Sequence, residues 1–96
     1  MFVLNKYNFC NKKYIVSIGA DPFCVYADSE DEAVEMIAAY LIAHGNSDWY
    51  FDAIEMDVMA ASVSKSITDF IKDADLRYCP NNKIYLPKCK VEEVSL

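Results

Sequence analysis

The acidic residues of this chain are concentrated in its middle. Between Asp21 and Ser64 there are ten carboxylates and no Lys or Arg, in a sequence of 96 residues with a formal net charge of −6. The ten are Asp21, Asp28, Glu30, Asp31, Glu32, Glu35, Asp48, Asp52, Glu55 and Asp57. Such a concentration of negative charge repels nucleic acids and membrane surfaces and attracts basic protein surfaces. We therefore expect a protein partner, with no direct nucleic-acid binding and no membrane binding.

Catalysis by these residues is not expected. Nucleophilic catalysis needs a base beside the nucleophile, and the single histidine, His44, falls at the end of a predicted helix, where the helix dipole favours it. Paired carboxylates that act as acid and base need one acid in an apolar pocket, whereas these acids fall at predicted solvent-facing positions. We assign no catalytic residue. An enzyme would require His44 or a cysteine in a concave pocket with a displaced pKa.

No metal or cofactor site is predicted. The cysteines form no C-x-x-C pair and have apolar or aromatic neighbours, which is typical of reduced, buried thiols in the cytosol. They are Cys10, Cys24, Cys79 and Cys89. The acids of 28–32 do not form an EF-hand loop, because Ala33 stands where a glycine is needed and Ala39 where a glutamate is needed. The chain also lacks the Gly-rich motifs that bind phosphates.

The first part of the chain predicts a β-hairpin. Tyr14–Ile18 is β-branched and aromatic, Gly19-Ala20-Asp21-Pro22 supplies a turn, and Phe23–Ala27 resumes the strand pattern. An earlier strand is expected within Phe2–Cys10, with a turn at Asn11-Lys12. The fold is therefore expected to begin as an antiparallel meander.

A helix is predicted from Glu30 to His44. Ser29 and Glu32 have the spacing of a capping box, and acids in the first turn favour the positive end of the helix dipole. Gly45 is the residue expected just beyond the end of a helix.

The segment Ala33–Ala43 of this helix contains Glu35 as its only charged residue. A helix that is apolar around most of its circumference is covered on two sides or takes part in an interface. The second possibility predicts a homodimeric structural or regulatory module assembled through residues 33–43.

A half-buried strand is predicted within Trp49–Ala60, where apolar and polar residues alternate with a period of two. Its apolar face is expected to carry Ile54, Met56 and Val58. Its solvent face would carry Glu55 and Asp57 in a row, roughly 6 to 7 Å apart.

A second helix is predicted after Ser62 or Ser64, with apolar residues at helical spacing. These are Val63, Ile67, Phe70, Ile71 and Ala74. A break at Cys79–Asn82 precedes Lys83–Leu86 and Val91–Leu96, which read as one interrupted strand or two short ones. Pro87 marks an edge or a bulge between them.

The predicted order is β-β-β-α-β-α-β within one domain, residues 1–96. This order favours an α+β fold in which an antiparallel sheet of four to five strands carries two helices, packed mainly on one face. The chain has no apolar run of about 18 residues, so we expect a soluble protein without a cleaved secretion signal.

If the acids share one face of the fold, they form a surface for a basic partner. The predicted partner-binding residues are Glu30, Asp31, Glu35, Asp48, Trp49, Tyr50, Asp52, Glu55 and Asp57. Aromatic residues among charges are typical interface anchors, although the plainer interpretation puts two of Trp49, Tyr50 and Phe51 in the core. Excess acidic residues also serve solubility alone, usually with both signs of charge interspersed.

The residues Tyr14-Ile15-Val16 and Val25-Tyr26-Ala27-Asp28-Ser29-Glu30-Asp31-Glu32-Ala33 carry a resemblance. This strand followed by an A-x-S-x-x-E-A helix start resembles small phage and mobile-element domains. Several anti-CRISPR and other anti-defence proteins are similar in size, acidity and layout. The resemblance covers residues 14–44 and implies a phage-encoded protein in the cytoplasm of a host cell.

The acidic middle and the resemblance together favour a non-catalytic protein-binding inhibitor. We expect it to bind a basic surface of a host nucleic-acid-binding protein, for example a CRISPR effector, and to block access of DNA or RNA. No cofactor is expected. The homodimeric module is the alternative.

Overall fold

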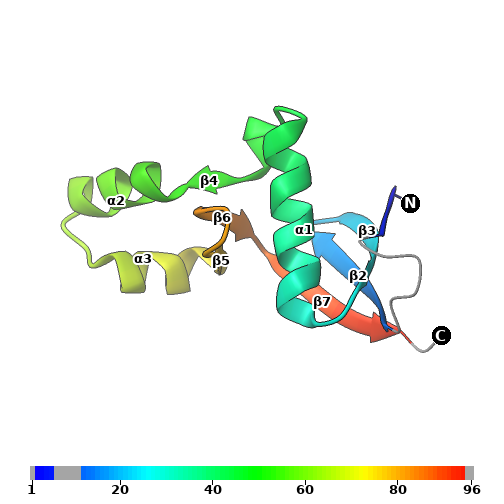
Figure 1. Cartoon of the computed structure of the whole chain (residues 1–96). Helices are drawn as coiled ribbons and strands as arrows, with labels where there is room; N and C mark the ends of the chain where they lie inside the picture. Colours follow the sequence, from blue (N-terminus) through cyan, green and yellow to red (C-terminus); the bar gives the residue numbers. More distant parts are fainter. Residues whose placement is uncertain (1, 6–11, 95–96) are drawn as a thin grey trace.

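The computed structural model describes residues 2–5 and 12–94 (Figure 1). These residues form an α+β fold with two β-sheets and three α-helices. The elements are β1 (Phe2–Asn5), β2 (Lys12–Ile18), β3 (Asp21–Ala27), α1 (Glu30–Ala43), the 3-10 helix η1 (Ser47–Trp49), β4 (Phe51–Asp52), α2 (Ala53–Ser62), α3 (Ile67–Ala74), β5 (Leu76–Cys79), β6 (Ile84–Pro87) and β7 (Cys89–Val94). The predicted α+β class is confirmed, whereas the single sheet with two helices is wrong.

The larger sheet has the strand order β1-β3-β2-β7. The predicted hairpin is confirmed, because β2 and β3 pair antiparallel with Tyr14 opposite Val25 and Val16 opposite Phe23. The strand predicted at the end of the chain is also present, as β7 pairs antiparallel with β2. Residues 95–96 of that prediction lie outside the described residues.

The predicted meander at the start of the chain is wrong. A strand does occupy Phe2–Asn5, but it runs parallel to β3, with Phe2 opposite Phe23. The position beside β2 that a meander would have given to β1 is occupied by β7. Cys10 and Asn11, the latter in the predicted turn, lie outside the described residues.

The smaller sheet has the strand order β4-β6-β5, and its pairs are antiparallel. It joins the larger sheet where β6 passes into β7 through Lys88. The backbone N–H of Lys88 donates a hydrogen bond of 3.0 Å to the carbonyl oxygen of Asp75, the residue before β5. Both residues have positive φ angles, 47° at Lys88 and 54° at Asp75, in a region that side-chain sterics disfavour.

Helix α1 lies across the larger sheet and buries its apolar stripe there (Figure 1). The buried residues of α1 are Ala33, Val34, Ile37, Ala38 and Leu41. The same core includes residues of both sheets, among them Val16, Val25, Ile84 and Leu86. One hydrophobic core therefore joins α1 to both sheets.

The predicted limits of α1 are nearly those observed. The Ser29 hydroxyl accepts a hydrogen bond of 3.2 Å from the backbone N–H of Glu32, and the Glu32 carboxylate accepts one from the backbone N–H of Asp28. These bonds satisfy N–H groups at the start of the helix. His44 is the C-cap, and Gly45 follows with φ +67°.

The strand predicted within Trp49–Ala60 is wrong. Only Phe51–Asp52 is a strand, and Ala53–Ser62 forms α2. The Asp52 carboxylate caps this helix by accepting a hydrogen bond of 2.8 Å from the backbone N–H of Ile54. The apparent alternation arises because α2 has apolar residues on two faces, and its Ala, Met and Glu residues are good helix formers.

The second predicted helix begins later than expected. It covers Ile67–Ala74, and its N-cap is Ser66, whose hydroxyl accepts a hydrogen bond from the backbone N–H of Asp69. Val63, which was expected inside this helix, instead caps the end of α2. The strand β5, directly after α3, was not predicted, because the helix ends at an aspartate rather than at a glycine.

Helices α2 and α3 form a hairpin that projects from the body of the fold (Figure 1). The molecule is accordingly elongated, with extents of 46 × 24 × 22 Å. Within this hairpin, Met56 and Ala60 are the buried residues, and they lie outside the main hydrophobic core. The hairpin is therefore mostly surface.

The packing of α1 predicts different effects of the same substitution at two positions. Ile37 is fully buried, whereas Ile42 is 41% exposed. We expect Ile37→Ala to lower the free energy of unfolding by about 2 to 5 kcal/mol, because it leaves a cavity. Ile42→Ala should cost less than about 1 kcal/mol. Urea unfolding followed by circular dichroism measures both, and equal losses would contradict the observed orientation of α1.

Candidate functional site

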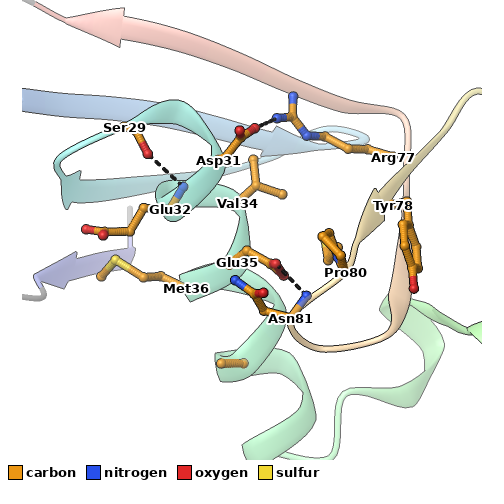
Figure 2. A pocket seen from close by; sticks show the side chains of 12 residues that line it. Ser29, Asp31, Glu32, Val34, Glu35, Met36, Arg77, Tyr78, Pro80 and Asn81 are labelled. Atoms are coloured by element: carbon orange, nitrogen blue, oxygen red, sulfur yellow. Dashed lines mark hydrogen bonds and ion pairs between the residues drawn. The ribbon is translucent and has the colours of Figure 1, made fainter.

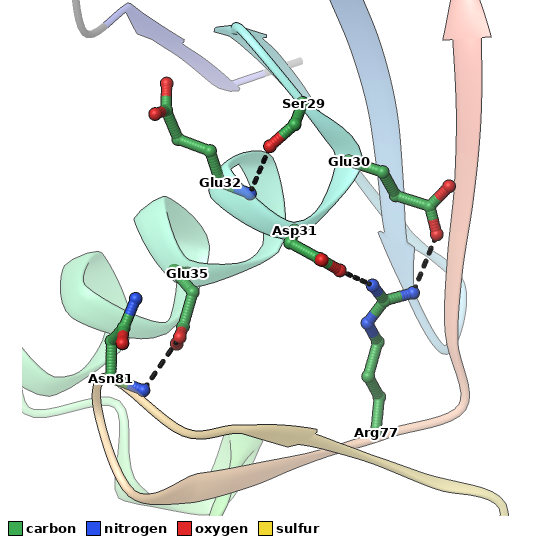
Figure 3. Close-up of polar contacts among 7 residues, drawn as sticks. All are labelled: Ser29, Glu30, Asp31, Glu32, Glu35, Arg77 and Asn81. Carbon is green, nitrogen blue, oxygen red and sulfur yellow. Dashed lines mark hydrogen bonds and ion pairs between the residues drawn. The ribbon is translucent and has the colours of Figure 1, made fainter.

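The structure divides the nine predicted partner-binding residues between two regions. Three of them lie on α1: Glu30 and Asp31 face Arg77 of β5, and Glu35 faces the β5–β6 turn (Figure 3). The other six lie on the segment from η1 to α2, which leads into the projecting hairpin (Figure 1). These six are Asp48, Trp49, Tyr50, Asp52, Glu55 and Asp57.

Arg77 of β5 binds two of the α1 acids. Its Nη1 lies 2.8 Å from Glu30 Oε1, and its Nη2 lies 2.9 Å from Asp31 Oδ1 (Figure 3). Partial burial disfavours the charge of Arg77, but the hydrogen bond to Glu30 and the nearby negative charges outweigh it and raise its pKa above the ordinary value. Since these acids are paired within the chain, they contribute less to an attractive field than the sequence suggests.

Glu35 holds the β5–β6 turn against α1. Its carboxylate accepts a hydrogen bond of 2.8 Å from the backbone N–H of Asn81 and one of 3.1 Å from the side-chain amide of Asn82. The same amide also donates to the backbone carbonyl of Glu35. The role of Glu35 in this structure is therefore to position the turn.

A groove of about 660 Å³ lies between the first turns of α1 and strand β5 (Figure 2). Its lining combines the Arg77 and Glu35 contacts with Met36, Tyr78 and Cys79. This volume is within the range of small-molecule pockets. Because the groove contains Cys79, it is a candidate for a catalytic site with a cysteine nucleophile.

Cys79 does not have the properties of a catalytic nucleophile. Burial, together with the charge of Glu35, raises the pKa of its thiol to about 12, so the thiol is protonated at neutral pH. A reactive cysteine requires the opposite shift, because the thiolate is the nucleophile. His44 does not line the groove; it is exposed and stacks on Tyr40, with ring centroids 4.1 Å apart.

The aromatic pair predicted as an interface anchor packs against the core. Trp49 and Tyr50 are both partly buried against the main hydrophobic cluster. Trp49 meets Phe23 edge to face, with ring centroids 6.0 Å apart. Phe51 is also half-buried, as a residue of β4. These rings therefore attach the η1–β4 segment to the body of the fold and leave less surface for a partner.

The acids of α2 differ from those of α1. Glu55 and Asp57 are exposed, and neither forms an ion pair with any residue in the described ranges. They do not form the predicted row, because residues two positions apart in a helix lie about 200° apart around its axis. They occupy two sides of α2, which is also where the largest exposed apolar side chains are found.

Arg77, which binds Glu30 and Asp31 of α1, was not identified from the sequence. The available signal was that Arg77 is the only arginine of the chain, and arginine is the cation best suited to binding two carboxylates at once. The exposed apolar residues Ile54 and Val58 were also missed, since the strand prediction placed them inside.

Two further features are absent from the part of the chain that the structure describes. Its His, Cys, Asp and Glu side chains form no group of three or more that could hold a metal ion. None of its helices has both the length and the apolar character needed to cross a membrane.

Comparisons with protein-family models, with curated proteins and with solved structures found no match to this chain. Its function is therefore argued from the geometry of the two regions described above.

The Arg77 contacts predict that lysine cannot replace this arginine. Arg77→Lys keeps the charge but replaces a planar fork with a point charge that cannot bind both carboxylates in the same geometry. We expect the free energy of unfolding to fall by about 0.5 to 1.5 kcal/mol, since the contacts are only partly buried. Urea unfolding at low and high salt measures this loss, which should shrink as salt rises. A lysine variant as stable as the wild type at low salt would contradict the assigned role.

The raised pKa of Cys79 predicts a loss of stability at alkaline pH. The pKa of this thiol is about 12 in the fold against 9.0 for an ordinary thiol. The fold therefore keeps its full stability below pH 9.0 and loses stability as the pH rises towards 12, because the unfolded chain releases the thiol proton first. Two pH units above the ordinary pKa, the loss would be at most about 2 to 3 kcal/mol. Cys79→Ala should reduce the slope of unfolding free energy against pH in this range, measured by urea unfolding. An unchanged slope would contradict the shift.

Proposed function

We propose that this protein is a non-catalytic, protein-binding inhibitor of the phage anti-defence type. Its acidic surface would occupy a basic nucleic-acid-binding site of a host protein, such as a CRISPR effector, and keep DNA or RNA out. The proposal follows from the sequence-based expectation and is supported by one structural observation, the unpaired acids on the projecting hairpin.

This observation concerns Asp52, Glu55 and Asp57 at the start of α2. All three are exposed, and none forms an ion pair with a described residue. Lys65, the next cation along the chain, forms an ion pair with Asp73 of α3. Lys83 lies beside the start of α2, where its carbonyl oxygen accepts a hydrogen bond from the backbone N–H of Ala53. Three carboxylates outnumber this one cation, so the local field is negative and can attract a basic surface over a distance of about 8 to 10 Å at moderate salt.

The helical geometry shortens the spacing of these charges along the axis, but it places Glu55 and Asp57 on two sides of α2 instead of in one row. A helix advances about 1.5 Å per residue, so the three carboxylates are about 3 to 4.5 Å apart along the axis. Duplex DNA presents one charge per about 1.7 Å, and a strand would have separated Glu55 and Asp57 by about 6 to 7 Å. The acids of α2 therefore do not reproduce a line of phosphates, but each side of the helix presents a carboxylate that can contact a separate Lys or Arg of a basic site.

The alternative, a homodimer through residues 33–43, gains no support from the position of α1. The apolar stripe of this segment, with Ile37 and Leu41 at its centre, is buried in the core of the chain itself. Only Ala39, Ile42 and Ala43 of its apolar residues are exposed, which leaves a small apolar surface for a second copy.

The proposal predicts that charge reversal on α2 weakens partner binding. The immobilised protein should capture a nucleic-acid-binding protein from host lysate, and adding the inhibitor to that purified partner should release its DNA or RNA. We expect the double substitution Glu55→Lys and Asp57→Lys to weaken the affinity at least about tenfold, because it turns attraction into repulsion. A gel-shift competition assay across a salt series measures this effect.

A matched control is available on β7. Glu92→Lys with Glu93→Lys changes the net charge of the protein by the same amount, on exposed residues of the other end of the fold. Because Glu93 forms a 3.9 Å ion pair with Lys12, circular dichroism first verifies that this variant folds. This control should bind nearly as well as the wild type. If both double variants lose binding equally, only net charge matters and a local acidic surface is wrong. Binding that does not respond to salt would contradict the proposal as a whole.

A further inference from the structure

Helix α2 exposes large apolar side chains together. Ile54 is 73% exposed and Val58 63% exposed, and Met59 and Val63 are exposed near the end of the helix. Single exposed apolar residues are common on protein surfaces. Here, however, four of the six most exposed large apolar side chains among the described residues belong to this one helix and its C-cap. Such a concentration indicates a contact surface.

The exposed residues form a stripe opposite the buried face of α2. Met56 and Ala60, four residues apart, are the buried pair. Ile54 and Val58 are also four residues apart, and Val58 lies about 200° around the helix from Met56. Ala61 continues the stripe by one more turn, which completes the i, i+4, i+7 spacing of a helix that binds in a groove.

The acidic residues of α2 lie on the two sides of this stripe. At about 100° per residue, Glu55 and Asp57 fall about 80° to either side of the line that runs through Ile54 and Val58. An apolar stripe with a carboxylate on each side matches a groove with an apolar floor and cationic rims. A second copy of this chain does not match, because it would place these carboxylates against their own counterparts.

We propose that α2 is a docking helix that places Ile54 and Val58 into an apolar groove of a basic partner protein, while Glu55 and Asp57 contact Lys or Arg residues on its two rims. This inference rests on the proposed function, and it adds the element that makes the contact and the kind of groove that receives it. The projecting hairpin gives the stripe open access (Figure 1).

The test uses the purified host protein captured in the experiment above and compares two alanine variants of the full chain. Ile54→Ala with Val58→Ala removes the stripe without loss of helix propensity, because alanine is the best helix former. The control is Ile42→Ala, the same truncation at a residue of α1 that is 41% exposed. Circular dichroism before and after heating verifies that both variants fold.

We expect the double variant to bind the partner at least about tenfold more weakly at all salt concentrations, because anchors in a groove contribute by burial rather than by charge. The Ile42→Ala control should bind within about twofold of the wild type. A photo-crosslinker replacing Val58 should label the partner at a segment containing Lys or Arg, and the same group at Ile42 should not.

The outcomes separate the two proposals. If the double alanine variant binds as tightly as the wild type while Glu55→Lys with Asp57→Lys does not, the docking helix is wrong and the acidic inhibitor stands. If sedimentation shows a dimer that the alanine variant abolishes, the stripe is a contact between copies and the docking helix is also wrong. If no host protein with a basic nucleic-acid-binding site is captured, both proposals are overturned.

Discussion

The arrangement of this protein depends on the attachment of α1 by two different faces. Its apolar stripe, with Ile37 and Leu41 at the centre, is buried against the larger sheet and is held by the hydrophobic effect. Its acidic side holds the smaller sheet through Arg77 and the β5–β6 turn through Glu35. The hydrophobic effect has no preferred direction, whereas the hydrogen bonds and ion pairs of Arg77 and Glu35 have defined geometry and help to fix where the smaller sheet lies. Together with Ile84 and Leu86, which join the smaller sheet to the same core, these contacts position the sheet from which the hairpin projects.

Local chemistry made part of the fold predictable. Ser29 and Glu32 identified the start of α1, and the turn at Gly19 identified the β2–β3 hairpin, because both signals lie within a few residues of the structure they determine. The segment around Met56 misled, since alternation over five residues fits a strand and also a helix with two apolar faces. The division into two sheets depends on pairing between distant segments, which periodicity does not report.

The candidate site shows the same limit of sequence-based prediction, because its ion pairs also join distant segments. Along the sequence, the acids around Glu30 have no cation near them, yet in the fold Arg77 approaches from β5 and binds two of them. Acidic and basic residues that form ion pairs in this fold are therefore far apart in the sequence. Glu55 and Asp57 of α2, by contrast, form no ion pair with a described residue. The predicted acidic region was thus a mixture of acids that hold the fold together and acids that remain for a partner.

Strand β7 pairs with β2 at one edge of the larger sheet, and β1 forms the opposite edge. During synthesis, β2 leaves the ribosome well before β7, the neighbour with which it pairs. Until then its open edge is exposed, and non-local pairing of this kind is slow. Pairing with β7 therefore completes this side of the sheet, and before that step the edge of β2 is open to wrong pairing.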